Sequence, residues 1–352
     1  MNLEERYMQR CLDLAVLGAG TVSPNPMVGA VIVYKNCIIG EGYTSPYGGP
    51  HAEVNALRVV LEKFGEIESR IIFSHSTIYV SLEPCSHFGK TPPCADMLVD
   101  YGFQKVVIGC LDPFTKVNGR GVEKLREGGI ETKVGVLEQK CQFINRRFFT
   151  RIKEMRPYVI LKWAETSDGY FAPAANSQRW ISNIASKQLT HKWRAEEDSI
   201  LIGTNTARVD NPSLTTREWI GKNPKRILID KDLKIPQSAA VFDSSAETVV
   251  FNAIRSDWSS NVKLIELENF DFYLPQTILY QLYLMDIQSI IIEGGIQTLQ
   301  SFIDADLWDE ARIFVSKQQW KIGQRAPSLP VANPINIKVA NDILQLYYKE
   351  CY

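Results

Sequence analysis

Apolar and polar positions alternate in short blocks along the first half of the chain. Apolar residues from Met8 to Ala15 recur at helical spacing and predict an amphipathic helix over residues 4–17. Two apolar runs separated by a short turn, at residues 30–34 and 37–41, predict a hairpin. The rest of this half predicts helices at residues 52–64, 94–101 and 122–127 and strands at residues 77–81, 105–108 and 131–136. This succession predicts an α/β sandwich.

The second half alternates in the same way and predicts a second α/β domain. It predicts strands at residues 158–164, 199–202, 226–229, 248–252 and 289–292, helices at 186–195 and 296–305, and a late antiparallel hairpin near 310–316. Six of the seven cysteines precede residue 142, and all seven tryptophans follow residue 160. A basic segment that ends in proline, residues 145–157, lies between the halves. We therefore expect two domains, residues 1–147 and 148–352.

Composition and charge narrow the class of protein. The chain has 352 residues, of which 45% are hydrophobic and 22% charged, as in ordinary globular proteins. A net charge of −1 provides no field that would attract nucleic acid or an anionic membrane. The opening segment carries acids where a signal peptide carries bases, and no apolar run approaches the ~20 residues of a membrane span. We expect a cytoplasmic protein with reduced cysteines and a small-molecule partner; the oligomeric state, a homo-oligomer included, stays open.

Three residues with metal-ligand chemistry occur in a fixed order. His51-Ala52-Glu53 opens a predicted helix, Pro84-Cys85 follows a strand, and Cys94 opens another helix. One histidine and two cysteines suit tetrahedral zinc with one position left for water, whose pKa zinc lowers toward neutrality. Glu53 stands two residues from His51, close enough to carry a proton to a leaving amine. A structural zinc would need a fourth protein ligand, and none is found at fitting spacing, so the pattern favours a catalytic zinc deaminase.

The order of three motifs resembles one family in particular. Residues 24–29 (PNPMVG), then 51–53, then 84–94 (PCSHFGKTPPC) resemble the bifunctional deaminase/reductase of riboflavin biosynthesis. The resemblance implies a cytidine-deaminase-like fold and hydrolysis of an amino group of 2,5-diamino-6-ribosylamino-4(3H)-pyrimidinone 5′-phosphate. It also implies three contacts with that substrate, namely Asn25, His87 and Lys90. Without the resemblance, Asn25 is equally typical of a turn between two prolines.

The second half carries weaker motifs of its own. No Gly-x-Gly-x-x-Gly follows a strand, so a standard Rossmann domain is not indicated. Residues 291–295 (IIEGG) predict a buried strand and then glycines before a helix, whose N–H groups can bind phosphate, although the pattern is also typical of a plain turn. Together with residues 162–169, 200–206 and 210–214, they resemble the reductase domain of the same family. The resemblance implies a dihydrofolate-reductase-like fold and NADPH-dependent reduction of the ribosyl group of 5-amino-6-(5-phosphoribosylamino)uracil to ribityl.

The same resemblance assigns binding residues in the reductase half. The residues implied for NADPH are Ala164, Trp180, Thr206, Asp210, Gly294 and Gly295. The residues implied for the reductase substrate are Ser177, Arg194, Leu214, Arg217 and Glu293. An arginine fork suits phosphate because it binds in a bidentate manner. The plain alternatives are a solvated charge for either arginine and core packing for Trp180.

The chain departs from the family pattern at several positions. Residues 112–115 read Asp-Pro-Phe-Thr where the family has Asp-Pro-Asn-Pro, and residues 64–76 are longer than usual; we expect both segments to be loops. Eight residues separate Cys85 from Cys94, where most zinc deaminases have two. An extra residue before Trp180 leaves either Ser177 or Gln178 in the family's serine position.

The sequence thus predicts a bifunctional riboflavin-biosynthesis enzyme with zinc and NADPH as cofactors. One alternative is a zinc deaminase that acts on a nucleotide or a tRNA base, with an inactive or accessory second domain. The spacing between Cys85 and Cys94 and the nearly neutral net charge disfavour it. Another alternative is a non-catalytic scaffold with structural zinc, against which Glu53 argues. The preference for NADPH over NADH and the proton donor of the reductase do not follow from the residues.

Overall fold

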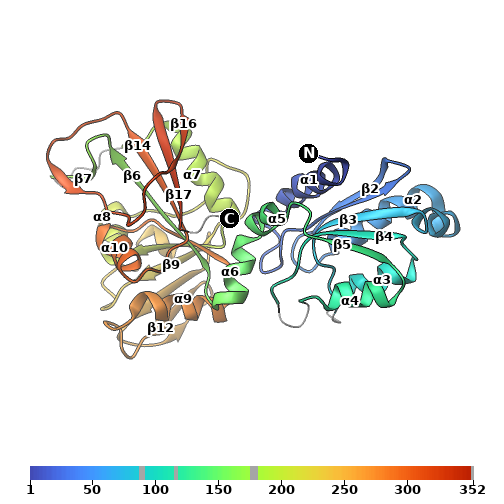
Figure 1. Ribbon diagram of the computed structural model, residues 1–352. Coiled ribbons are helices and arrows are strands. Elements are labelled where there is room, and N and C mark those ends of the chain that lie inside the picture. The colour runs from blue at the N-terminus through green and yellow to red at the C-terminus, as the bar shows by residue number, and fades with distance from the viewer. Residues whose placement is uncertain (87–91, 115–117, 175–180, 350–352) are drawn as a thin grey trace. The chain divides into compact units, whose positions relative to one another are not determined.

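The computed structural model describes residues 1–86, 92–114, 118–174 and 181–349. The chain divides into two compact units, residues 1–154 and the part from Met155 onward (Figure 1). The boundary expected from the sequence, between residues 147 and 148, falls inside helix α6 (Arg146–Glu154), which belongs to the first unit.

The first unit is built on a five-stranded mixed sheet in the order β2-β1-β3-β4-β5. Its strands are β1 (Gly29–Tyr34), β2 (Cys37–Tyr43), β3 (Ser76–Leu82), β4 (Lys105–Cys110) and β5 (Glu131–Val134). β1 runs antiparallel to both β2 and β3, whereas β3, β4 and β5 are parallel. Its helices are α1 (Leu3–Ala15), α2 (Ala52–Phe73), α3 (Cys94–Asp100), α4 (Arg120–Glu127), α5 (Glu138–Ile144) and α6. The predicted hairpin and the alternation of helices and strands are confirmed.

Two glycines show that helices cover both faces of this sheet. A Cβ on Gly29 would lie 1.9 Å from the carbonyl oxygen of Cys11 in α1. A Cβ on Gly42, which pairs with Ala30, would lie 2.4 Å from the carbonyl oxygen of Ala52 in α2. Because neighbouring residues of a strand point to opposite faces, α1 and α2 lie on opposite sides of the sheet. The first unit is therefore the α/β/α sandwich that the sequence predicted.

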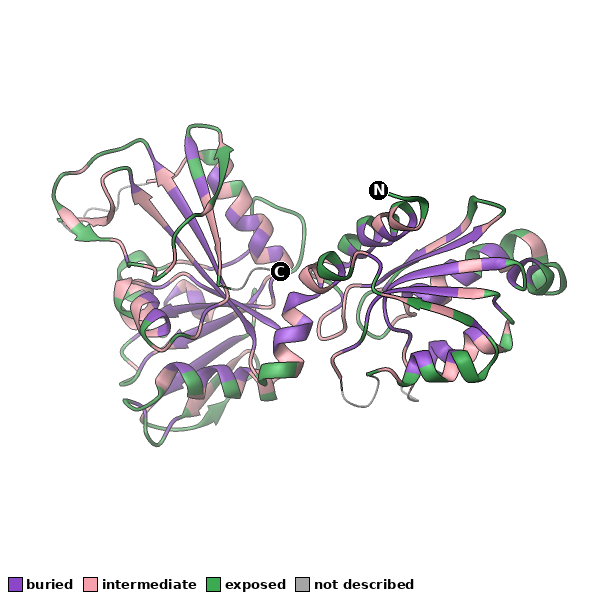
Figure 2. Ribbon diagram, in the orientation of Figure 1, coloured by how far each residue is buried: buried purple, intermediate pink, exposed green. Residues whose placement is uncertain are grey.

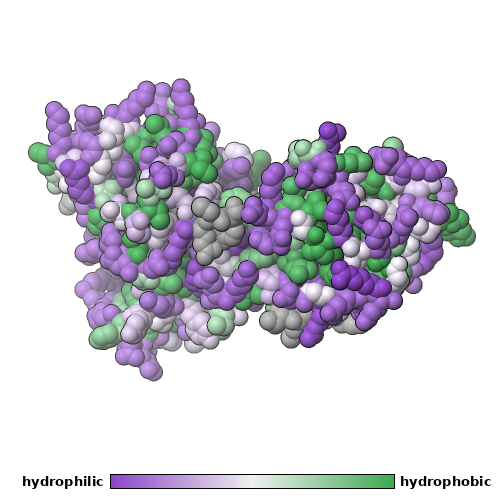
Figure 3. Space-filling view, in the orientation of Figure 1, coloured by the Kyte–Doolittle hydropathy of each residue, from purple (hydrophilic) through white to green (hydrophobic). Residues whose placement is uncertain are grey.

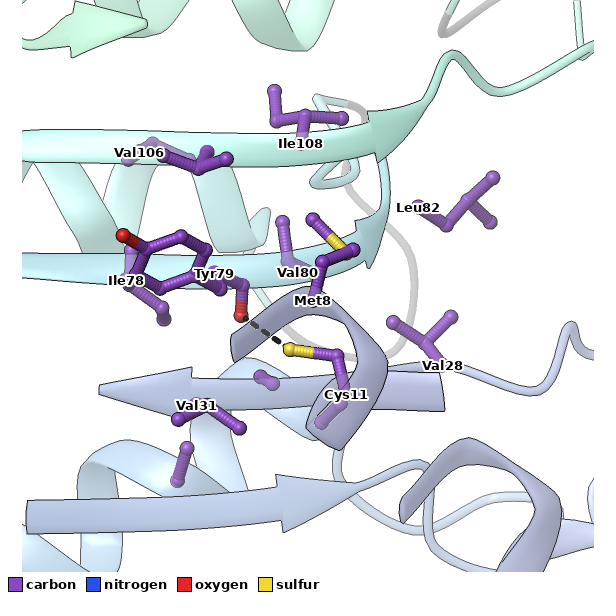
Figure 4. Close-up of a cluster of buried hydrophobic side chains, with 14 of the residues drawn as sticks. Met8, Cys11, Val28, Val31, Ile78, Tyr79, Val80, Leu82, Val106 and Ile108 are labelled. Carbon is purple, nitrogen blue, oxygen red and sulfur yellow. Dashed lines mark hydrogen bonds between the residues drawn. The ribbon is translucent and has the colours of Figure 1, made fainter. Parts of the chain in front are cut away.

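Part of the core of the first unit lies between the sheet and α1 (Figure 4). Met8 and Cys11 of α1 are fully buried in the same cluster as Val31 and Tyr79, which point to this face of the sheet. The Cys11 thiol donates a hydrogen bond of 3.4 Å to the carbonyl oxygen of Tyr79. The helical spacing of apolar residues thus correctly identified the buried face of α1.

The loop expected at residues 64–76 is wrong. α2 continues to Phe73 after a break at Gly65, whose φ of 74° only glycine adopts readily. The turn after the break packs back onto the first part of the helix, because the Ser69 hydroxyl donates to the carbonyl oxygen of Val60. Ile72 and Phe73 are buried, so the extra residues add a helical turn to the core.

The second unit is built on a ten-stranded sheet in the order β11-β12-β10-β9-β8-β13-β6-β14-β17-β16. The seven strands from β12 to β14 in this order are parallel, and β11, β17 and β16 run antiparallel to their neighbours. The strands are β6 (Tyr158–Thr166), β8 (Ser199–Gly203), β9 (Lys225–Ile229), β10 (Thr248–Asn252), β11 (Asp257–Trp258), β12 (Val262–Glu266), β13 (Ser289–Ile292), β14 (Glu310–Ser316), β16 (Ile335–Val339) and β17 (Asp342–Tyr348). A separate pair consists of β7 (Tyr170–Pro173) and β15 (Gly323–Arg325). Near residues 310–316 the predicted hairpin is wrong in detail, because β14 pairs with β17 while β16 and β17 form the hairpin.

Helices cover both faces of the second sheet as well. They are α7 (Ile184–Glu196), α8 (Thr204–Asp210), α9 (Leu274–Leu284) and α10 (Ile296–Asp304). Val159 and Leu161 of β6 belong to a buried cluster that includes residues of α9 and α10. Tyr158 and Ile160, which point to the other face, pack in a cluster with Trp193 of α7. Figure 2 shows that the strands of both units are largely buried while the outer sides of the helices are exposed.

The surface of each unit is mostly polar on the face that Figure 3 shows. Figure 3 shows hydrophilic side chains over much of this face of each unit, with apolar side chains gathered in several groups between them. Within the described residues, no helix combines the length and the apolar character that crossing a membrane requires.

Candidate active sites

The three expected zinc ligands converge at one end of the first sheet. His51 caps the N-terminus of α2, Cys85 follows β3, and Cys94 opens α3. The ligand atoms of the three residues all lie within 4.8 Å of one another. The backbone N–H of Cys94 donates to the Cys85 sulfur at 3.3 Å, and the N–H of Ala95 donates to the Cys85 carbonyl oxygen. These bonds fix the position of Cys85 relative to the start of α3.

The spacing of the ligand atoms fits zinc. His51 Nδ1 lies 3.6 Å from Cys85 Sγ and 3.4 Å from Cys94 Sγ. A tetrahedral zinc with Zn–N and Zn–S bonds of about 2.1 and 2.3 Å places such N and S atoms about 3.5 Å apart. The donor set and its geometry therefore suit a zinc ion with three protein ligands, as in catalytic sites.

The same cluster perturbs the proton affinities of its members. The hydrogen bond with Cys94, followed by that with His51, lowers the pKa of Cys85 to about 4. The hydrogen bond with Cys85 raises the pKa of His51 to about 9. Cys85 is therefore stable as the thiolate, the form in which cysteine binds a metal.

Glu53 lies in the first turn of α2 and is only 4% exposed. Burial raises the pKa of its carboxyl group above the ordinary range, although the nearby His51 opposes this. A raised pKa suits a group that must take up a proton and release it again near neutral pH. The structure thus brings Glu53 and the three expected ligands together.

A cavity of about 430 Å³ opens over this cluster. Its lining includes His51, Glu53 and Cys85, together with the expected substrate residue Asn25. The volume is within the range of small-ligand sites. Phe114, which stands where the family has asparagine, also lines the cavity, so the departure from the family pattern lies at the site itself.

Glu83 is a residue of this cavity that the sequence analysis missed. It is buried, and its carboxylate accepts hydrogen bonds from the backbone N–H groups of Asp112, Gly119, Gly121 and Val122 at 2.8–3.3 Å. One side chain thereby holds the segment that lines the cavity and leads into α4. Its position two residues before Cys85, in Glu-Pro-Cys, was the only signal in the sequence.

In the second unit, the expected cofactor residues Thr206 and Gly295 lie next to each other, near the ends of two parallel strands. β8 and β13 are adjacent; β8 leads directly into α8, and β13 leads into α10 after the three residues 293–295. A Cβ on Gly295 would lie 3.4 Å from the Thr206 hydroxyl oxygen, so these residues are neighbours. A Cβ on Gly203 or Gly294 would collide with Thr298 of α10. This close approach leaves two helix N-termini side by side at the carboxyl edge of the sheet, a favourable place for a dinucleotide phosphate.

The other expected cofactor residues of the described part lie on neighbouring elements. Ala164 is half-buried on β6, which pairs with β13. Asp210 ends α8, the helix that carries Thr206, and is exposed. The structure therefore brings Thr206 and Gly295 together, whereas Asp210 lies one turn further along the helix.

Two expected substrate residues form an ion pair, and a third is connected to them through hydrogen bonds. Arg194 Nη2 donates to Glu293 Oε2 at 2.7 Å, and Arg194 Nη1 donates to the carbonyl oxygen of Thr215 at 3.4 Å. The side chain of Arg217 donates to the Thr215 hydroxyl, and Leu214 is buried in the same segment. Arg194 and Glu293 thus form an ion pair, and Thr215 connects Arg194 to Arg217.

Lys162 and His191 also belong to this group and were missed. Lys162 Nζ lies 3.8 Å from Glu293 Oε1, and burial lowers the pKa of this lysine. Burial raises the pKa of Glu293, but Arg194 and Lys162 outweigh it and hold the pKa below its ordinary value. His191 Nδ1 accepts from the backbone N–H of Arg217, and burial beside two arginines lowers its pKa to about 4. Lys162 begins the motif at residues 162–169 and could have been noted there.

Four of the expected site residues, and one alternative, lie outside the described residues. They are His87, Lys90, Ser177 and Trp180, with Gln178 as the alternative for the serine position. Their roles stay predictions.

Comparison with known proteins identifies the family. Residues 1–110 match the cytidine and deoxycytidylate deaminase zinc-binding region, and residues 157–317 match the RibD C-terminal domain. The riboflavin biosynthesis protein RibD of Aquifex aeolicus (strain VF5) is 39% identical over 322 residues, which cover 90% of this chain and 87% of that protein. The chain belongs to the RibD family. The RibD protein of Bacillus amyloliquefaciens is 36% identical and matches 89% of the chain and 84% of its own length.

A solved structure extends the match to the fold. The crystal structure of a diaminohydroxyphosphoribosylaminopyrimidine deaminase/5-amino-6-(5-phosphoribosylamino)uracil reductase from Thermotoga maritima is 34% identical, with a TM-score of 0.86 and 98% of both chains covered. The fold class predicted from the sequence, a cytidine-deaminase-like α/β/α sandwich followed by a dihydrofolate-reductase-like α/β domain, is confirmed by the match to this structure and to the two family regions. Membership of the RibD family also confirms zinc and NADPH as the cofactors. An unrelated accessory second domain is not supported, because that half matches the RibD C-terminal domain.

Proposed function

We propose that the chain catalyses two consecutive steps of riboflavin biosynthesis on one phosphorylated pyrimidine. Residues 1–147 would deaminate 2,5-diamino-6-ribosylamino-4(3H)-pyrimidinone 5′-phosphate, and residues 148–352 would reduce the ribosyl group of the product to ribityl. The observation that carries the proposal is the zinc-type cluster of His51, Cys85 and Cys94 in one cavity with the buried Glu53. The similar protein from Thermotoga maritima is a deaminase and reductase of the same two kinds.

In the deaminase, the protein's own residues would position the substrate and move protons. Zinc, when bound, supplies Lewis-acid chemistry that makes a water molecule ionise near neutral pH. Glu53, buried and with a raised pKa, would accept a proton from the attacking water and deliver it to the leaving amine. Asn25, His87 and Lys90 would bind the substrate; of these, the described Asn25 lines the cavity.

In the reductase, the main task of the protein would be to hold NADPH and the substrate in the correct position relative to each other. NADPH supplies the hydride. The adjoining N-termini of α8 and α10, with Thr206, Gly294 and Gly295, suit its phosphates. Ala164, Trp180 and Asp210 complete the proposed cofactor residues. Arg194 and Glu293, held together at 2.7 Å, would bind the substrate with Ser177, Leu214 and Arg217.

The proposal is compatible with the expectations on partners and location. The described residues proposed for both sites lie within this one chain. None of the six cysteines among the described residues forms a disulfide, in keeping with the proposed cytoplasmic location.

A single substitution tests the deaminase assignment. Glu53→Gln keeps the shape of the side chain but removes the carboxylate, so deamination should fall by roughly 10²–10⁴-fold. Zinc content and NADPH-dependent reduction of the deaminated substrate should stay at wild-type levels. Glu62→Gln, an exposed position on the same helix, is the matched control. Deamination by the Glu53 variant at the wild-type rate would remove the proposed role of this residue.

A further inference from the structure

The last helix of the first unit forms part of the deaminase cavity. Phe148, Arg151 and Ile152 of α6 line it together with the zinc ligands His51 and Cys85. Their spacing of three and four residues places all three on one face of the helix. α6 follows the last strand of the sheet and lies outside the matched zinc-binding region, which ends at residue 110.

Charge distinguishes Arg151 from the rest of the lining. Among the described residues that line the cavity, the acidic ones are Glu53, Glu83 and Asp112, and Arg151 is the one basic side chain besides the ligand His51. Glu83 is already engaged by four backbone N–H groups. A phosphate group would be repelled by the carboxylates, so among the described side chains of the lining the electrostatically favourable place for it is beside Arg151.

The substrate of the deaminase carries a phosphate group, which needs a binding place of this kind. The relative from Thermotoga maritima deaminates a phosphoribosylaminopyrimidine, in which the reacting pyrimidine and the phosphate are at opposite ends of the molecule. With the pyrimidine at the zinc cluster, the phosphate must lie elsewhere in the cavity or at its mouth. Arg151 is half-buried. A guanidinium in partly dehydrated surroundings binds phosphate in a bidentate manner and more strongly than it would in open water.

We propose that Arg151 of α6 binds the phosphate of the deaminase substrate and thereby selects the phosphorylated compound over its nucleoside. This role rests on the proposed function. It makes Arg151 a substrate-binding residue that acts at a distance from the reacting carbon. Because the phosphate takes no part in the chemistry, the contact stabilises the bound substrate and the transition state alike, and its loss should raise KM more than it lowers kcat.

Arg151→Gln and Arg151→Lys, in the full-length zinc-loaded protein, test the proposal. Lys153→Gln on the same helix is the matched control, because Lys153 is exposed and is not part of the cavity lining. Deamination would be measured with the phosphorylated substrate and with the same compound after phosphatase treatment. Inhibition of deamination by ribose 5-phosphate gives a second readout that does not depend on turnover of the nucleoside. NADPH-dependent reduction by each variant reports whether the rest of the protein is intact.

The proposal predicts a selective loss. Removing a charge-assisted hydrogen bond should raise KM for the phosphorylated substrate by roughly ten- to hundredfold in Arg151→Gln, with partial recovery in Arg151→Lys. The nucleoside should be turned over equally by the variant and the wild type, and ribose 5-phosphate should inhibit the variant correspondingly less. An equal loss with both substrates, or an unchanged inhibition constant for ribose 5-phosphate, would overturn the proposal. Failure of the wild-type protein to deaminate either compound would instead contradict the proposed function.

Discussion

The carboxylate of Glu83 organises the wall of the deaminase cavity, and Glu83→Gln tests that role. Oε2 accepts from the N–H groups of Asp112 and Gly119 at 3.2 and 3.0 Å, and Oε1 accepts from those of Gly121 and Val122 at 2.8 and 3.3 Å. A glutamine has one carbonyl oxygen, so its NH₂ group must face two of these N–H donors. The substitution therefore preserves the volume of the side chain while removing half of the acceptors.

The expected cost follows from the number of bonds lost. Each buried donor left without an acceptor costs about 1–3 kcal/mol, and two such donors give about 3–4 kcal/mol at the middle of that range. For a domain of this size, such a loss lowers the melting temperature by roughly 10 °C. Because the segment held by Glu83 lines the cavity, deaminase activity should be lost at the same temperature as the fold.

Heat inactivation of both activities in one preparation measures this effect. In Glu83→Gln the deaminase should lose activity roughly 10 °C below the wild type, while the reductase, which belongs to the other unit, should be unchanged. Glu127→Gln, an exposed position on α4, is the control and should behave as the wild type. If the deaminase activity of Glu83→Gln survived to the wild-type temperature, the four hydrogen bonds would not stabilise the cavity wall.

Three further predictions concern acid–base behaviour, charge and metal. Burial raises the pKa of Asp112 from its ordinary value of 3.8 to about 6. The folded protein therefore favours the protonated carboxyl group, and it loses stability at this residue as the pH rises from about 4 to about 6. Asp112→Asn should therefore be more stable than the wild type above pH 6, by up to about 3 kcal/mol, with no gain below pH 4 in urea unfolding. Lys162→Met removes the cation that lies 3.8 Å from Glu293. It should lower kcat/KM of the reductase at least about tenfold without affecting deamination. A reductase rate equal to that of the wild type would exclude a role for Lys162 in reduction. Chelation of zinc should abolish deamination and spare NADPH-dependent reduction, with recovery on adding zinc; a chelator-resistant deaminase would contradict the metal site.

Helices and strands with a regular pattern of apolar residues could be predicted from the sequence. The helix from Leu3 to Ala15 has a regular apolar face, and the strand from Ser199 to Gly203 is a continuous apolar run between polar flanks. The zinc cluster was also predictable, since His51, Cys85 and Cys94 each stand at the start of a helix or the end of a strand. In these cases local pattern and tertiary contacts agree.

Features that depend on long-range contacts could not be predicted. The carboxylate of Glu83 meets N–H groups almost forty residues away, and nothing near it in the sequence marks that role. Arg151 lines the cavity only because α6 folds back over it. Likewise, the helical residues after Gly65 are held by a hydrogen bond from Ser69 to Val60, a contact that the extra length of residues 64–76 did not reveal.

Mass spectrometry of substrate turnover tests the central claim most directly. The purified protein, loaded with zinc, would be given the diaminopyrimidinone ribosyl phosphate with and without NADPH. We predict a gain of about one mass unit without NADPH, since deamination replaces an amino group by oxygen, and about two more with it, since hydride and a proton are added. Only the first gain would leave the second domain without its proposed activity. An unchanged mass with zinc confirmed in the protein would contradict the account of both sites.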